Sequence, residues 1–254
     1  MKHPAISHPF KSLLAAIRFL TILPLPGSGE SDTSFFGGAL FYFPITGLLI
    51  GSFIALCAFF LVNTLPIGVV AVLLTIVLSL ASGFLHLDGL ADSCDGLLSA
   101  RPAQKCLEIM RDSRIGVMGA AALSAVFLLK TASIAALDPT NIYSALIIAP
   151  VAGRTSIIFM MALLPYARKS EGLGVLFYSG NNRWAAFFST LFFIAVTTVL
   201  IPSKLIMLSL TLVVSVAVFS WVCRKKIGGA TGDTLGAVCE ITETMVLIAF
   251  CTNL

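Results

Sequence analysis

Residues 86–96 read HLDGLADSCDG and place three carboxylates, Asp88, Asp92 and Asp95, directly after a long apolar run. Steps of four and then three residues bring these acids onto one face if the segment is helical. Three anions on one face favour a bound cation, and carboxylate oxygens suit a hard divalent ion such as Mg²⁺. The two glycines of the stretch admit the close approach of a backbone or of a ligand.

The composition around this stretch is that of a membrane protein. The chain has 254 residues, of which 58% are hydrophobic and 11% are charged, and its mean hydropathy is +1.01. Because about a quarter of the residues in soluble domains carry charge, we expect a polytopic, all-α helical bundle. The chain leaves no room for a soluble domain, so residues 1–254 form a single membrane-embedded domain. The net charge of +4 is too small and too dispersed to indicate a nucleic-acid partner.

We expect about seven transmembrane helices and one N-terminal interfacial helix. Residues 10–25 are apolar but short and are interrupted by Arg18, which favours an interfacial helix over a span or a signal peptide. The six cysteines form no CxxC pair, so their spacing supports neither a zinc site nor a disulfide framework. The spans are expected at about 37–62, 67–86, 115–136, 142–164, 184–201, 204–223 and 235–252.

Charge predicts the orientation of this bundle. The long loops and the amino terminus fall on one side of the membrane, and 13 of the 16 Lys and Arg residues lie there. By the positive-inside rule this side is cytoplasmic. Eleven of the twelve acids, all but Asp138, lie there or at helix ends that face it, although acids do not follow that rule. Their bias favours a cytoplasm-facing active site over a transport path through the midplane.

The three acids predict a magnesium site that serves phosphoryl transfer, with a solvated acidic helix face as the alternative. His86 is a candidate ligand or base, but a single histidine at the end of a span is more often an interfacial hydrogen bonder.

Downstream, Asp112 is a further candidate ligand. Its neighbours Arg111 and Arg114 suit phosphate recognition, and ion pairing among these residues is the alternative.

Charges also occur inside the predicted spans. Arg154 lies within the fourth span, where an ionisable group is by default functional or paired. It could face the phosphates of a substrate, or pair with Glu240 or Glu243, which stand three residues apart on the last helix. Lys130, near the outer end of its span, is expected to snorkel to the membrane surface.

A glycine-rich loop, IGGATGD at 227–233, precedes the last helix. Gly228, Gly229, Thr231 and Gly232 could form an anion-binding nest that ends in Asp233, a further metal ligand. The loop lacks the GK[ST] ending of a Walker A motif. A flexible turn with Asp233 as a helix N-cap is the alternative. Arg168, in PYARKSEGLG at 165–174, is likewise a candidate for substrate binding, with a structural role as the alternative.

Four of these stretches, HLDGLADSCDG, MRDSRIG at 110–116, PYAR and GGATGD, together resemble the motif set of the cobalamin synthase family, the adenosylcobinamide-GDP ribazoletransferases. The resemblance covers nearly the whole chain. It implies an Mg²⁺-dependent integral membrane enzyme in which the ribose 3′-hydroxyl of α-ribazole, or of its 5′-phosphate, attacks the phosphorus attached to cobinamide, and GMP leaves. Asp88, Asp92 and Asp95 match the acidic motif of the family, and Asp233 matches its glycine-rich one.

The resemblance also implies the partners and the location. The substrates are a corrinoid nucleotide and α-ribazole, and the surroundings are the bilayer of a bacterial or archaeal cell (inner) membrane. A homo-oligomer, or association with other cobalamin-assembly enzymes, is compatible with it. One carboxylate of the site, or His86, would accept the proton of the attacking hydroxyl.

Two other functions compete with this interpretation. A membrane phosphotransferase of the CDP-alcohol type has a similar acidic motif, but that motif requires an Arg where this chain has Asp92. A cation or proton transporter could use the same carboxylates as an ion path.

Overall fold

The computed structural model describes residues 8–25, 29–168, 177–178 and 182–252, and this part of the chain forms helices and no β-strand. The expected all-α class is confirmed. The α-helices are α1 (Pro9–Leu20), α2 (Phe36–Ala39), α3 (Phe43–Leu61), α4 (Ile67–Ala81), α5 (Leu85–Leu97), α6 (Ala103–Ile109), α7 (Val117–Ala136), α8 (Ile142–Leu163), α9 (Asn182–Leu200), α10 (Leu205–Ile227) and α11 (Gly232–Phe250). Short 3-10 helices are η2 (Gly29–Phe35), η3 (Leu40–Tyr42) and η5 (Pro202–Lys204).

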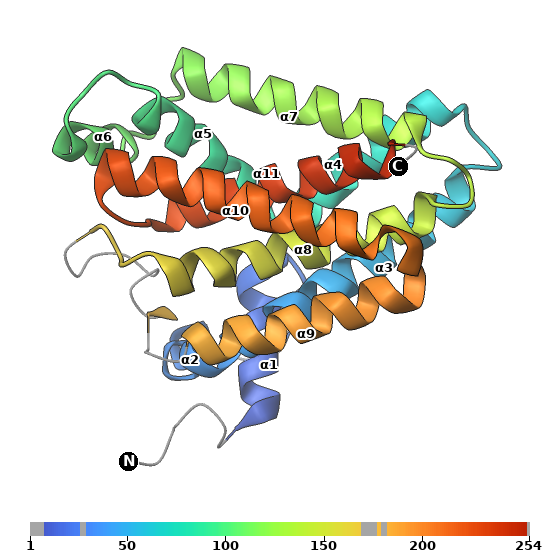
Figure 1. Cartoon of the computed structure of the whole chain (residues 1–254), viewed down its shortest axis with the longest axis horizontal. Helices are drawn as coiled ribbons and strands as arrows, with labels where there is room; N and C mark the ends of the chain where they lie inside the picture. Colours follow the sequence, from blue (N-terminus) through green and yellow to red (C-terminus); the bar gives the residue numbers. More distant parts are fainter. Residues whose placement is uncertain (1–7, 26–28, 169–176, 179–181, 253–254) are drawn as a thin grey trace.

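The expected polytopic membrane bundle is confirmed, but the count of seven spans is not. Among the described residues, five helical segments are long and apolar enough to cross a membrane: Asp32–Leu61, Val117–Ala136, Ile142–Leu163, Asn182–Leu200 and Pro202–Ile227. They run roughly side by side, and the 12-residue α1 crosses them steeply (Figure 1). The expected last span is α11, whose 19 residues include three carboxylates.

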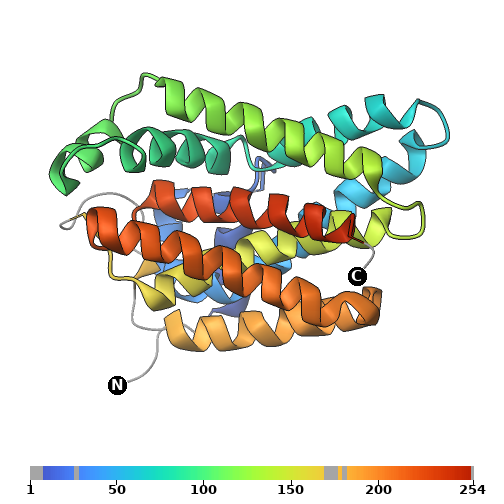
Figure 2. The ribbon, with the colours of Figure 1, turned by 45° about the horizontal axis from the view of Figure 1, so that its top comes forward.

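The expected second span, 67–86, is broken in the structure, because α5 leaves α4 at 90°. The break is a Schellman motif: the N–H of Gly83 donates to the carbonyl of Leu80 at 2.8 Å, and the N–H of Phe84 donates to that of Ser79 at 3.0 Å. Gly83 has a φ of 59°, a left-handed conformation that glycine adopts without a Cβ clash. The acidic stretch therefore lies on a helix of its own, and α7 packs against both α4 and α5 (Figure 2).

Small residues set the spacing of the spans. In α3, Gly47 and Gly51 stand four residues apart and face α8, where a Cβ on Gly47 would lie 2.5 Å from the carbonyl oxygen of Pro150. A Cβ on Gly51 would lie 2.7 Å from the Cα of Ile147, so both positions let the two backbones approach closely.

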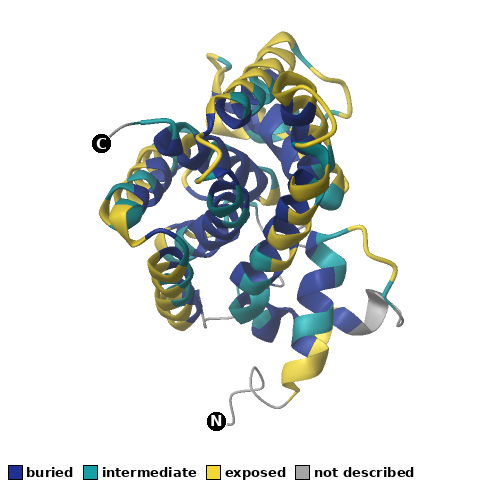
Figure 3. Ribbon diagram, turned by 90° about the vertical axis from the view of Figure 1, so that its right-hand side faces the viewer, coloured by how far each residue is buried: buried dark blue, intermediate teal, exposed yellow. Residues whose placement is uncertain are grey.

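Burial increases from the outer helices to the middle of the bundle. Buried residues gather on the central helices, and exposed ones lie on the outer faces (Figure 3). Large apolar side chains such as Phe60, Val199 and Ile206 remain exposed there. Such faces fit contact with lipid tails, which are as apolar as these side chains.

Candidate active site

Two glycines bring the acidic helix α5 against the start of α11. A Cβ on Gly89 would lie 2.6 Å from the carbonyl oxygen of Asp233, and a Cβ on Gly236 would lie 3.1 Å from the Cα of His86. Because neither residue has a side chain, the first turns of the two helices lie side by side. Gly89 thus admits a backbone, one of the two roles expected for the glycines of this stretch.

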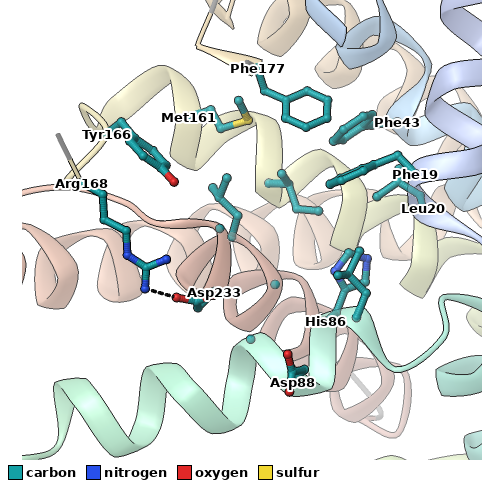
Figure 4. Close-up of a pocket in the computed structure, with 16 residues that line it drawn as sticks. Phe19, Leu20, Phe43, His86, Asp88, Met161, Tyr166, Arg168, Phe177 and Asp233 are labelled. Atoms are coloured by element: carbon teal, nitrogen blue, oxygen red, sulfur yellow. Dashed lines mark hydrogen bonds and ion pairs between the residues drawn. The ribbon is translucent and has the colours of Figure 1, made fainter. Parts of the chain in front are cut away.

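A cavity of about 250 Å³ lies where these helix starts meet α1, α3 and α8. Figure 4 shows that its polar side chains come from three places: His86 and Asp88 from α5, Asp233 from α11, and Tyr166 and Arg168 from the segment after α8. Most of the remaining wall is apolar. The cavity therefore joins residues that are far apart in the sequence and that the motifs singled out separately.

Negative charge accumulates beside this cavity. Asp92 and Asp233 lie outside the five spanning helices. Burial, followed by the charges of Asp88, Asp233 and Asp95, raises the pKa of Asp92 to about 7. Burial also raises the pKa of Asp233, although Arg168 opposes this, because its Nη2 donates to Asp233 Oδ2 at 2.6 Å. The carboxylates of α5 and α11 are close enough to repel one another, and a cation would relieve that repulsion.

The side chains beside the cavity offer carboxylate oxygens, which Mg²⁺ prefers as ligands, but they do not form a complete coordination shell. Within the described residues, no group of three or more His, Cys, Asp or Glu side chains is placed to hold a metal ion. Mg²⁺ usually keeps several waters and is bound by one or two carboxylates together with substrate phosphates. Asp88, which is exposed and lines the cavity, and the half-buried Asp92 can supply those carboxylates.

Asp95 also has a structural role that the sequence did not indicate. Its carboxylate accepts the backbone N–H of Gly116 at 2.7 Å and that of Gly119 at 2.9 Å, both at the start of α7. An anion there stabilises the helix dipole and satisfies amides that lack a partner within the helix. The three acids lie on one helix, which is the condition under which their spacing puts them on one face. The ligand role of Asp95 stays a prediction beside its structural one.

Asp112 and Arg114 pair with each other in the connection between α6 and α7. Arg114 Nη2 donates to Asp112 Oδ2 at 2.6 Å and Arg114 Nε to Asp112 Oδ1 at 3.0 Å, which lowers the pKa of Asp112 to about 2. The Arg114 side chain is 87% exposed, so this is the ion pairing named as the alternative to phosphate binding. Arg111 lies nearer the cavity: burial raises the pKa of the Tyr166 hydroxyl, and the charge of Arg111 is among those that oppose this rise.

Four charged residues form a buried network deeper in the bundle. Lys130 Nζ donates to Glu240 Oε2 at 2.7 Å and to Glu243 Oε2 at 2.6 Å, and Arg154 Nη1 donates to Glu243 Oε1. Each side chain is at most 3% exposed. The expected snorkelling of Lys130 is wrong, because two carboxylates of α11 meet its ammonium group inside the bundle. The expectation that Glu240 and Glu243 lie on the cytoplasmic side or at a helix end that faces it is also wrong, because both lie well inside α11.

This network confirms the structural alternative for Arg154, its pairing with Glu243. Arg154 is not among the residues that line the cavity, so its predicted contact with substrate phosphates has no support from the geometry.

His86 lies between this network and the cavity. It lines the cavity, is 2% exposed, and has no hydrogen-bond partner for either ring nitrogen in the described part of the chain. The charges of Arg154, Glu243 and Lys130 act on it. An unpaired buried polar atom costs about 1–3 kcal/mol, so the imidazole is able to bind a ligand in the cavity.

The glycine-rich loop joins two helices. Gly228, with a φ of 76°, ends α10, and Gly229 contacts the carbonyl of Pro165 so closely that a side chain would not fit. Thr231 caps α11, because its Oγ1 accepts the N–H of Thr234 at 3.2 Å. The alternative in which Asp233 is the N-cap is therefore wrong. Of the four residues predicted to form a nest, Gly232 lines the cavity.

Sequence reasoning missed the aromatic part of the cavity. Phe19, Phe43 and Phe177 line it, and none of the three belongs to one of the charged or glycine-rich motifs, although Phe19 follows Arg18 and Phe177 closely follows PYARKSEGLG. Tyr166 could have been predicted as a site residue, because it belongs to the PYAR motif that also contains Arg168.

Comparisons with known proteins place the chain in a family. Residues 12–251 match the model of the family described as Cobalamin-5-phosphate synthase. A relative from Clostridium novyi, described as adenosylcobinamide-GDP ribazoletransferase, is 36% identical over 94% of this chain and 96% of its own length. Relatives with the same description from Roseiflexus sp. and Klebsiella pneumoniae are 39% and 35% identical over 94% of this chain, and over 88% and 98% of their own lengths. No solved structure matches the chain.

Proposed function

The chain belongs to the cobalamin-5-phosphate synthase family, and we infer that it is an adenosylcobinamide-GDP ribazoletransferase. It joins adenosylcobinamide-GDP to α-ribazole, or to α-ribazole 5′-phosphate, and gives adenosylcobalamin, or its 5′-phosphate, and GMP. Family membership favours this activity over a CDP-alcohol phosphotransferase and over a cation or proton transporter. The observation that supports the site is the cavity that Asp88, Asp233 and Arg168 line together, with Arg168 bonded to Asp233.

The reaction exchanges one P–O bond for another. The ribose 3′-oxygen of α-ribazole bonds to the phosphorus attached to cobinamide, and the bond from that phosphorus to the bridging oxygen of the diphosphate breaks. GMP leaves with the electron pair of that bond. The proton of the attacking hydroxyl passes to a carboxylate of the site or to His86, which lines the same cavity.

We propose that Asp88 and Asp92 supply the carboxylates that hold Mg²⁺ together with substrate phosphates, with Asp233 as a further candidate ligand. Such an ion would neutralise charge on the diphosphate, which is the main requirement of phosphoryl transfer. Arg168 donates a hydrogen bond to Asp233 through Nη2. Its Nε has no hydrogen-bond partner in the described part of the chain, so the guanidinium has a further donor for a phosphate oxygen. The ligand roles of Asp95 and Asp112 remain weaker alternatives, since both oxygens of each carboxylate already accept hydrogen bonds. In Asp233, by contrast, Arg168 and Thr231 both donate to Oδ2.

The protein is a multi-pass membrane protein, and we propose that the site faces the cytoplasm from the cell (inner) membrane of a bacterium or an archaeon. The support is the excess of Lys and Arg in the loops on the side of the cavity. A homo-oligomer, or association with other cobalamin-assembly enzymes, stays a prediction.

The test is to incubate purified protein with adenosylcobinamide-GDP, α-ribazole and Mg²⁺ and to measure GMP and cobalamin. We expect both products, their loss on adding a chelator, and recovery with Mg²⁺ in excess. Asp88→Asn and Asp92→Asn should each lower turnover at least about 100-fold. Glu108→Gln, at an exposed acid on α6 that pairs with Lys105, is the matched control and should keep it. Absence of GMP from the wild-type reaction would refute the activity.

A further inference from the structure

We propose that the aromatic end of the cavity binds the benzimidazole base of α-ribazole and so presents the ribose to the carboxylates. The proposal rests on the function inferred above and deepens it, because it assigns one part of one substrate to one part of the site.

Three phenylalanines from separate elements form this end of the cavity. Phe19 of α1 lies 4.8 Å from Phe177 and 6.3 Å from Phe43 of α3, and Phe43 lies 5.6 Å from Phe177, measured between ring centroids. Figure 4 shows the three rings together on one side of the cavity, while Asp88, Asp233 and Arg168 lie toward the other. A fourth ring, Phe36, stacks on Phe177 at 4.5 Å but does not line the cavity.

The size of the cavity restricts what can enter it. Pockets that hold drug-sized ligands measure about 300–1,000 Å³, and this one measures about 250 Å³. A corrin ring with its nucleotide is far larger, so the corrinoid can reach the cavity only with its diphosphate end. A single aromatic base with its ribose is the part of the two substrates that suits a cavity of this volume.

The chemistry of the wall selects among the three bases that the substrates carry, which are the adenine and the guanine of adenosylcobinamide-GDP and the benzimidazole of α-ribazole. Adenine, like guanine, has an exocyclic amine. Besides the rings, Leu20, Ile157 and Met161 line the cavity, and none of them carries a nitrogen or oxygen atom in its side chain. Guanine would bury a carbonyl and an exocyclic amine there without partners, which is costly. A benzimidazole with methyl substituents has no exocyclic polar group and packs well on phenylalanine rings. His86 lies between the two ends and can meet a ribose hydroxyl.

The first test separates binding of the two substrates. Phe19→Leu removes a ring from the cavity wall and should raise the KM for α-ribazole about tenfold, while the KM for adenosylcobinamide-GDP changes less than about twofold. Phe36→Leu is the matched control, because it removes a ring of the same cluster that lies outside the wall. It should leave both KM values near those of the wild type. Equal effects of the two variants on α-ribazole would overturn the proposal.

A second test does not depend on turnover. Ile157→Phe puts a larger side chain into the apolar wall of the cavity without removing a ring, and equilibrium dialysis of the purified protein against α-ribazole alone should show binding weakened at least about tenfold. Adenosine should compete poorly with α-ribazole, because its base carries an exocyclic amine. If the Ile157→Phe protein binds α-ribazole as tightly as the wild type does, the cavity is not the binding site of the base. The same conclusion follows if added phospholipid, and nothing else, displaces α-ribazole from the protein. A wild-type protein that binds α-ribazole but releases no GMP would instead refute the proposed function.

Discussion

Removal of the Lys130 ammonium group should strongly destabilise the protein. Lys130 is 1% exposed and bonds both glutamates of α11, so the network of two cations and two carboxylates is neutral. Lys130→Met keeps the length of the side chain but leaves the interior with an uncompensated negative charge. Glu243 keeps Arg154, whereas Glu240 loses the ion pair that the structure shows for it.

The expected loss follows from the cost of breaking a buried ion pair. Removing one partner typically costs about 3–5 kcal/mol, and each kcal/mol lowers the melting temperature of a domain of this size by about 2–4 °C. We therefore expect Lys130→Met to lower Tm by about 6–20 °C. The assay is thermal unfolding of purified protein followed by circular dichroism, with the same detergent for every variant.

A double variant separates charge from packing. Lys130→Met combined with Glu240→Gln restores neutrality, and we expect it to recover more than half of the lost Tm, because neutral groups of similar volume often replace a buried pair well. Lys105→Met removes a lysine from an exposed pair on α6 and should leave Tm unchanged within error. A Tm for Lys130→Met within about 1 °C of the wild type would refute the buried network, and a double variant as unstable as the single one would show that packing, not charge, causes the loss.

Three further predictions concern the site. Asp95→Asn should lower Tm by several degrees in the same unfolding assay, because an amide can accept only with its one oxygen where the carboxylate accepts two N–H groups of α7; an unchanged Tm would contradict this role. Gly89→Ala should lower turnover at least about tenfold, measured as GMP release, since its Cβ would lie 2.6 Å from the carbonyl oxygen of Asp233 and must push α5 and α11 apart. Asp112→Asn should keep turnover within about twofold of the wild type, and a loss as large as that of Asp92→Asn would restore Asp112 as a metal ligand.

Much of the fold could be predicted because it depends on local patterns. Apolar runs of membrane-spanning length located most of the spans. The four-and-three spacing of Asp88, Asp92 and Asp95 indicated one shared face if the segment was helical, and the structure shows it as the helix α5. The break before α5 was missed, although Gly83 is a common signal for a helix end. An unbroken apolar run outweighed that glycine in locating the second span.

The parts that could not be predicted depend on partners far away in the sequence. Lys130 is buried because Glu240 and Glu243, more than 100 residues later, meet it inside the bundle. Its own surroundings in the sequence indicated only an apolar helix end. In the same way, the aromatic end of the cavity forms only when α1, α3 and the residues around Phe177 pack together, and no local pattern distinguishes these phenylalanines from those that face lipid.

One face of α11 connects the buried charges to the site. Asp233, Gly236, Glu240 and Glu243 recur at steps of three and four residues, so they share that face. Its first turn supplies the cavity carboxylate and the glycine that admits α5, and its later turns bind Lys130 and Arg154. A shift of α11 by one residue would turn this face by about 100° and lose all of these contacts together. We infer that the buried ion pairs fix the rotation of α11, which explains why such costly charges lie inside a membrane bundle although none of the four paired residues lines the cavity.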